Sequence, residues 1–141
     1  MEKISSLSSD NKNSKLIIRT IGSTEGVNKA FTVYEYEDEM IVADCGIGYP
    51  DMVDMPGVDV LIPDFTYVLE NSHKLKGLFI THGHADHIAA VPYFLQQLPD
   101  VEIYGSQFVI EMIKSSLNER NFTHTIKVLI IRLLKLILSY G

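Results

Sequence analysis

The stretch Thr81-His82-Gly83-His84-Ala85-Asp86-His87 decides how the rest of this chain is interpreted. It has the pattern H-x-H-x-D-H, so four side chains able to bind a metal ion lie close together along the chain: His82, His84, Asp86 and His87. In an extended segment, residues two apart point to the same side, so His82 and His84 could share one ion. Asp86 and His87 come where the chain turns into a helix, and could bind a second ion. Imidazole and carboxylate together suit zinc or a similar divalent cation.

Chance is a poor explanation for this motif. One surface histidine usually carries no chemistry, and two at i and i+2 are often coincidence. Four ligand-type residues in this order, directly after the apolar run 77–80, favour a metal site. Two adjacent ions can clamp both the attacking and the leaving oxygen of a phosphodiester. Asp86 is then the candidate catalytic residue as well as a ligand.

Outward from the motif, the spacing of apolar residues predicts alternating strands and helices. Strands are expected over residues 16–21, 31–36, 40–43, 58–62, 77–80 and 101–104. A short helix or turn is expected over 65–76, and a helix over 86–98 with a kink or a helix start at Pro92. A further helix over 106–117 would be capped by Ser106. The pattern indicates a layered α/β or α+β domain.

Size and charge narrow the class of protein. A chain of 141 residues with 46% hydrophobic residues is enough for one globular domain. Its formal charge of -6 argues against a dedicated nucleic-acid-binding module, but not against an RNA-cleaving enzyme whose metal site needs carboxylates. Cys45 is the only cysteine, so we expect a reducing, cytoplasmic setting. No apolar stretch reaches the roughly 18 residues of a membrane-spanning helix.

The composition divides the chain into three segments. Residues 1–15 are rich in Ser, Lys and Asn without an apolar core, and we expect a flexible lead-in rather than a signal peptide. Residues 16–120 are expected to form the domain. Residues 121–141 contain basic but no acidic side chains. Wound as a helix, this segment would place Lys127, Arg132 and Lys135 on one side, although we favour a divergent tail without a selected function.

The motif after a buried strand resembles the signature of the metallo-β-lactamase superfamily. Flanking segments resemble ribonuclease J in particular, and they cover residues 42–47, 57–64, 79–87, 91–95 and 103–106. The resemblance extends over about 16–119, and it implies the first half of an αββα sandwich, in the α+β class. It also implies two zinc ions and 5′-to-3′ exonucleolytic and endonucleolytic cleavage of RNA.

The resemblance assigns roles to individual residues. His82 and His84 would bind the first zinc ion, and Asp86 and His87 the second. Asp44 matches an early aspartate of the family that supports the ligands from behind, because such carboxylates orient metal-binding imidazoles. The alternative for Asp44 is a solvated turn residue. His73 is expected to be a surface histidine, and Cys45 a small buried residue rather than a ligand.

The chain also departs from the family. A complete site needs a third histidine, a bridging aspartate and a final histidine, but no aspartate follows Asp100, and the context of His124 matches none of these ligands. The loop Glu25-Gly26-Val27-Asn28 differs from the family's Glu-aliphatic-Gly-Lys-Asn. The RNA-binding insertion and the C-terminal domain of the family are missing. We therefore expect a truncated fragment that is inactive alone, with at most partial zinc occupancy.

Two other functions stay open. One is a different hydrolase of the same superfamily, such as a glyoxalase II-type thioesterase, against which the flanking segments argue. The other is a non-enzymatic remnant, or a fragment that works only with a partner, either a second copy or a full-length homologue. RNA remains the expected substrate.

Overall fold

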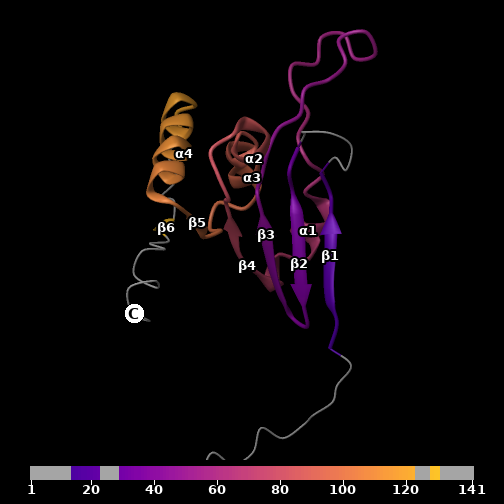
Figure 1. The fold of residues 1–141 in the computed structure, drawn as a ribbon, viewed down its shortest axis with the longest axis vertical. Coiled ribbons are helices and arrows are strands. Elements are labelled where there is room, and N and C mark those ends of the chain that lie inside the picture. Colours follow the sequence, from indigo (N-terminus) through magenta and orange to yellow (C-terminus); the bar gives the residue numbers. More distant parts are fainter. Residues whose placement is uncertain (1–13, 23–28, 123–127, 131–141) are drawn as a thin grey trace, which may run out of the picture.

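The structure is a computed structural model that describes residues 14–22, 29–122 and 128–130. Within these residues, six strands form a single sheet in the order β1-β2-β3-β4-β5-β6 (Figure 1). The first three strands form an antiparallel meander, and the last three join it in parallel. The strands are β1 Leu16–Thr20, β2 Thr32–Tyr36, β3 Glu39–Ala43, β4 Leu75–Phe79, β5 Ile103–Gly105 and β6 Val128–Ile130.

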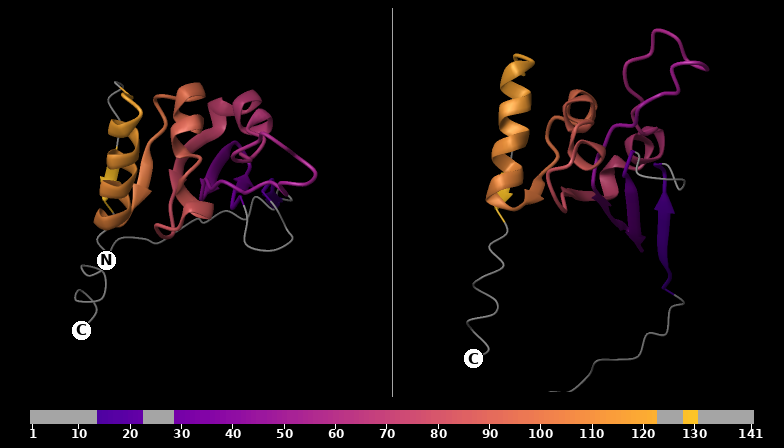
Figure 2. Two further views of the ribbon diagram at one scale, coloured as in Figure 1. Left: turned by 90° about the horizontal axis from the view of Figure 1, so that it is seen from above. Right: turned by 45° about the horizontal axis from the view of Figure 1, so that its top comes forward.

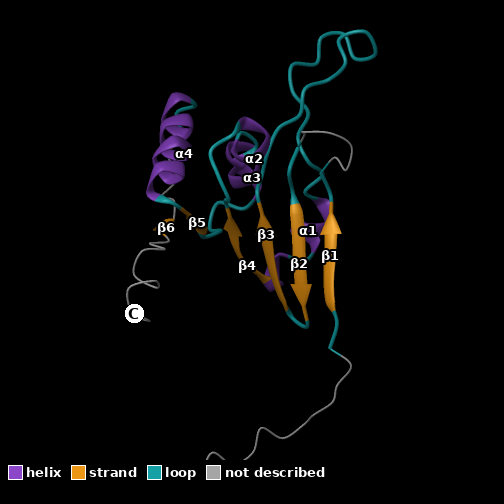
Figure 3. Cartoon of the chain, in the orientation of Figure 1, coloured by secondary structure: helices purple, strands orange, loops and turns teal. Residues whose placement is uncertain are grey.

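The helices of the described residues lie against one face of this sheet (Figure 2). They are α1 Thr66–Glu70, the 3₁₀ helix η1 Ser72–Lys74, α2 Ala85–Ile88, α3 Val91–Gln97 and α4 Gln107–Glu119. Parallel strands need a crossover connection, and the segments holding α2, α3 and α4 supply it. A long irregular loop joins β3 to α1 and extends beyond the end of the sheet (Figure 3).

The core lies between the sheet and the helices. Its centre is a cluster of three buried aromatic rings, Phe31 before β2, Phe65 before α1 and Phe94 in α3, whose centroids are 5.0–5.8 Å apart. The rings meet at tilted or edge-on angles, as aromatic pairs prefer. This cluster fixes α1 and α3 on the sheet, below the end at which the metal-binding motif emerges.

The opposite face of the sheet carries apolar side chains that no helix of the described residues covers. Phe79 and Tyr104 stack there with centroids 4.4 Å apart and nearly parallel rings. Tyr36 is 48% exposed, and the edge strand β1 exposes Leu16 and Ile18. A sheet with one face covered by helices and one apolar face left open is half of an αββα sandwich. The predicted α+β class and the partial sandwich are confirmed.

Most of the expected elements form, with shifts of a few residues. The expected strand over 58–62 is wrong, since only a single bridge pairs Gly48 with Leu61. Val58 and Ile62 are exposed, because no neighbouring strand lies beside this part of the loop to hold the alternating pattern. The expected helix over 86–98 is two helices, and Pro92 lies in the first turn of the second, where a missing N–H costs nothing. Ser106 caps α4 as predicted, since its hydroxyl accepts from Val109 N.

The segment 121–141 contributes one described strand. Residues 128–130 form β6 and pair with β5 in parallel, so the helical alternative does not hold for these residues. Residues 131–141 and the lead-in 1–13 lie outside the described residues. The three-part division of the chain stays a prediction. No helix of the described residues is both long and apolar enough to cross a membrane.

A buried carboxylate ties α1 and η1 to the sheet at the end away from the motif. Glu35 of β2 is 6% exposed, and it accepts a hydrogen bond from Lys74 Nζ at 2.7 Å and a second one from the Tyr67 hydroxyl. The guanidinium of Arg19 lies over the Tyr67 ring, 4.5 Å from its centroid. The hydrogen bond from Lys74, followed by that from Tyr67, lowers the pKa of Glu35.

We expect Glu35→Gln to lower the free energy of unfolding by about 2 kcal/mol near neutral pH, because Lys74 loses its charged partner. Because folding lowers the pKa of Glu35, its contribution is fully present above the unfolded-state pKa and is lost as pH falls through the folded-state value. Urea unfolding at several pH values should therefore show the two proteins converging in acid. Glu70→Gln, on the exposed side of α1, is the control. A gap that does not change with pH would contradict this assignment.

Candidate metal centre

The motif lies at the carboxyl end of the parallel strand β4. Ile80 follows the strand and continues its ladder, since its N–H donates to Tyr104 O at 2.8 Å. The chain stays extended to His84, whose φ and ψ are -73° and 148°, and α2 then begins at Ala85. Ligand sites of α/β sheets commonly lie at the carboxyl ends of parallel strands.

The segment after β3 lies alongside the motif and is bonded to it through the backbone. Cys45 N donates to His87 O at 2.7 Å, and Ile47 N donates to Ala85 O at 3.2 Å. A Cβ on Gly46 would lie 1.4 Å from the carbonyl oxygen of Asp86, so only glycine allows this approach. Main-chain bonds therefore hold the start of α2 in place.

Asp44 connects the two segments through its side chain. It is 7% exposed, and its backbone has a φ of +63°, which aspartate tolerates better than most residues. Its carboxylate accepts from Thr81 N at 2.8 Å and from the Thr81 hydroxyl at 3.0 Å. Its Oδ2 is also 2.8 Å from His87 Nδ1. The structure thus places Asp44 behind the motif, in contact with one of the four expected ligands.

These contacts orient two of the imidazole rings. A carboxylate can only accept, so His87 Nδ1 donates to Asp44, and its Nε2 faces Asp86 Oδ2 at 3.4 Å. The hydroxyl hydrogen of Thr81 goes to Asp44, so Thr81 Oγ1, 3.0 Å from His82 Nδ1, accepts from that nitrogen. His82 Nε2 then faces His84 Nδ1 at 3.1 Å. Asp44 orients the ring of His87 directly and that of His82 through Thr81.

The expected ligands meet in two pairs. His82 Nε2 and His84 Nδ1 are 3.1 Å apart, and Asp86 Oδ2 and His87 Nε2 are 3.4 Å apart. Two ligand atoms on a tetrahedral zinc ion are separated by about 3.3 Å, given the usual zinc–nitrogen distances. The rings of His82 and His87 are in contact, with centroids 4.0 Å apart, so the two pairs are neighbours. The donor atoms of each pair therefore fit one ion.

Each pair supplies only two donors. Among the residues that the structure describes, no group of three or more His, Cys, Asp or Glu side chains is arranged around one point. Structural zinc sites have four protein ligands and catalytic ones usually three. The described residues consequently provide part of a coordination shell.

An open hollow of about 420 Å³ adjoins the exposed side of the motif. His82 and His84 line one part of it, and Phe108, Val109 and Met112 of α4 line another. Asp86 and His87 are half-buried behind these two histidines. The pair of histidines is therefore open to solvent on the side of α4.

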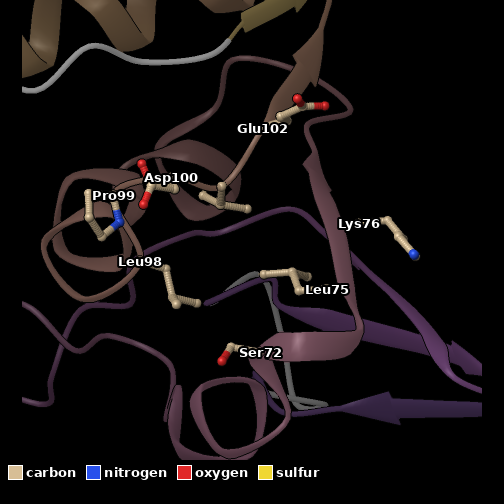
Figure 4. A pocket seen from close by; sticks show the side chains of 8 residues that line it. Ser72, Leu75, Lys76, Leu98, Pro99, Asp100 and Glu102 are labelled. Atoms are coloured by element: carbon tan, nitrogen blue, oxygen red, sulfur yellow. The ribbon is translucent and has the colours of Figure 1, made fainter.

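A larger hollow of about 500 Å³ lies at the other end of β4, away from the histidines (Figure 4). Asp100 and Lys76 stand on opposite sides of it in Figure 4. Lys76 pairs with Glu39 at 3.4 Å, and Glu102 accepts from the Tyr104 hydroxyl at 2.8 Å. The charged groups around this hollow do not converge on a common point, so we assign the site to the smaller hollow beside the motif.

The other residues considered as ligands in the sequence analysis have positions that indicate no chemical role. His73 is exposed on η1. Cys45 is fully buried, and burial, followed by the charge of Asp44, raises the pKa of its thiol well above the ordinary value. His124 and residues 23–28 lie outside the described residues. Sequence reasoning gave no role to Thr81 or Phe108. Thr81 directly precedes the first histidine, which was the available signal.

The comparisons with known protein families and with curated proteins agree on one family. The model of the Metallo-beta-lactamase superfamily matches residues 26–130. Ribonuclease J 2 of Staphylococcus aureus (strain MRSA252) is 41% identical over 116 residues, which are 82% of this chain and 20% of that protein. Ribonuclease J 2 of Staphylococcus saprophyticus is 40% identical over the same shares. The chain thus spans about a fifth of the length of these curated relatives.

Solved structures show a similar fold. The short form of human tRNase Z has a TM-score of 0.52 and 18% identity, over 80% of this chain and 42% of that one. A diphosphatase from the PhnP family has a TM-score of 0.50 and 16% identity, over 84% of this chain and 51% of that one. At such low identity the likeness concerns the fold alone. In both cases the match covers only part of the solved chain.

We expect Asp44→Asn to weaken zinc binding by about tenfold to a hundredfold, because His87 loses the partner that orients its ring. Thr81→Val should have a smaller effect, since it removes the hydroxyl contacts with Asp44 and His82 but leaves the contact of Asp44 with His87. Calorimetric titration with zinc measures both, and circular dichroism checks that the variants fold. Asp54→Asn, in the exposed loop after β3, is the control. Equal affinities for all four proteins would show that Asp44 does not position the ligands.

Proposed function

The chain belongs to the metallo-β-lactamase superfamily, and from this premise we propose that it is the metal-binding part of a ribonuclease J-like RNA hydrolase. The observation that supports this proposal best is the pairing of donor atoms at 3.1 and 3.4 Å in front of Asp44. The identity with the two ribonucleases favours RNA over a thioester as substrate. Zinc as the metal, 5′-to-3′ exonucleolytic and endonucleolytic cleavage, and a cytoplasmic location belong to the same proposal.

In this proposal His82 and His84 hold one zinc ion, and Asp86 and His87 hold the second. Two adjacent ions supply activation of water and neutralisation of the charge on a phosphodiester. Asp44 keeps the proton on His87 Nδ1 and so turns Nε2 toward the site. Asp86 is the proposed catalytic residue, because it is the one carboxylate in the set and can accept a hydrogen bond from a reacting water.

We expect the chain by itself to hydrolyse RNA poorly. Two protein donors for each ion are fewer than the three of a usual catalytic zinc site. The open apolar face of the sheet supports the same expectation, because the second half of a sandwich would cover it. A fragment that depends on a partner, either a second copy or a full-length homologue, is therefore part of the proposal.

Replacing His82 and His84 together by alanine should abolish binding of one equivalent of metal, since both donors of that pair are lost. Cobalt is a suitable probe, because its visible absorption reports the ligand set independently of any activity. His73→Ala, on exposed η1, is the matched control and should bind like the wild type. An unchanged cobalt spectrum in the double variant would refute the proposed ligands.

We also expect no appreciable turnover of 5′-monophosphorylated RNA by the purified chain with zinc, because the described residues supply only two donors for each ion. Hydrolysis is followed by gel electrophoresis of end-labelled RNA. Turnover that disappears in His84→Ala would show that the described residues suffice for catalysis, and the proposed dependence on a partner would then be wrong.

A further inference from the structure

We propose that Phe108 is the surface on which a base of the RNA substrate stacks, next to the phosphate that meets the metal cluster. This inference rests on the proposed function and adds to it the residue that holds the base. It starts from the hollow of about 420 Å³ between the motif and the first turn of α4. Figure 1 shows α4 standing beside α2 and α3, at the end of the sheet where the motif emerges.

Phe108 is exceptional among the apolar residues of α4. The buried face of this helix is formed by Val109, Ile110, Ile113 and Leu117, each at most 3% exposed. Phe108 is 72% exposed, one position after the helix begins. Exposing a phenyl ring to water costs free energy that burial would recover. A large aromatic ring held at the rim of a site by a rigid helix is suited to a flat partner.

The motif and α4 approach each other closely at this point. A Cβ on Gly83 would lie 2.6 Å from Met112 Sδ and 3.7 Å from Phe108 Cε1. Gly83 is the residue between His82 and His84, so the ring of Phe108 borders the segment that carries two proposed ligands. A molecule bound at the histidines would therefore reach Phe108 without crossing open solvent.

The hollow offers different chemical surroundings to the phosphate and to the base of a nucleotide. None of the described residues that line it carries a carboxylate, an ammonium or a guanidinium group. Its polar groups are the two imidazoles and the hydroxyls of Thr81 and Ser106, and the hydroxyl of Ser106 is engaged by Val109 N. A phosphate would need the cations of the metal cluster, whereas an uncharged planar base matches the apolar wall. A nucleotide offers both, joined through its ribose.

The size of the hollow also fits one nucleotide better than a folded domain. Small-molecule sites usually have volumes of about 300–1,000 Å³. Proteins that bind single-stranded RNA without reading its sequence stack bases on exposed aromatic rings in this way. The competing occupant is protein, either a second copy of this chain or further polypeptide, and the experiment below distinguishes it.

The test uses a property of the sequence, which contains no tryptophan. Phe108→Trp therefore creates a single fluorophore at the proposed stacking position. With zinc present, we expect a 5′-monophosphorylated oligoadenylate to quench its emission in a saturable way. The same oligomer without its first two bases should leave the emission unchanged. Tyr36→Trp, on the open sheet face away from the motif, is the matched control and should respond to neither.

Binding of the oligoadenylate should weaken about tenfold in Phe108→Ala and be restored in Phe108→Tyr, because stacking needs an aromatic ring. Circular dichroism of both variants excludes misfolding as the cause. Quenching that is equal with and without bases, or equal at Tyr36→Trp, would overturn the inference. So would an emission of Phe108→Trp that is blue-shifted in proportion to protein concentration before RNA is added, since a second copy would then cover the ring.

The failure of this inference and that of the proposed function give different results. If the cobalt spectrum requires His82 and His84 but Phe108→Trp is not quenched, the metal site stands and the stacking position is wrong. If the emission is quenched while the double alanine variant keeps its cobalt spectrum, Phe108 binds bases and the proposed ligand set is wrong.

Discussion

The buried carboxylate of Asp44 is the contact on which the architecture of the site depends. It lies at the end of β3, and it receives hydrogen bonds from Thr81 at the end of β4 and from His87 in α2. Burying a charge is costly unless hydrogen bonds satisfy it, so the two strand ends and the helix have to stay together. The same bonds turn the Nε2 atoms of two imidazoles toward the other side chains of the motif. One group thus links the stability of this end of the sheet to the orientation of the proposed metal ligands.

Local patterns in the sequence predicted most of the fold because they depend on short-range chemistry. The alternation in β2, the cap at Ser106 and the H-x-H-x-D-H spacing each follow from neighbouring residues. The pattern over 58–62 failed because a strand exists only where another strand pairs with it. Thr81 and Phe108 were missed for a similar reason. Thr81 contacts Asp44, which lies at the end of β3, far earlier in the sequence. Phe108 lies beside Gly83 of the motif, which is also distant from it in sequence.

The half-sandwich explains why the family is evident although the described residues supply only two donors to each proposed ion. The superfamily match, the helix-covered sheet and the ligand-bearing turn all fall within one continuous stretch of chain. Among the described residues, however, no three donors gather around one point, so the proposed ions would find only two donors each. The uncovered rings of Phe79 and Tyr104 lie on the face where the other half would pack.

The close contact between Gly46 and the carbonyl of Asp86 has a consequence for design. Main-chain bonds from Cys45 and Ile47 hold this turn, in addition to the contact of Asp44 with the His87 ring. The side chains on this turn can therefore be exchanged while its main-chain bonds are kept. Thiolates installed in place of imidazoles would redirect the same framework toward softer cations, such as cuprous copper, without redrawing the backbone.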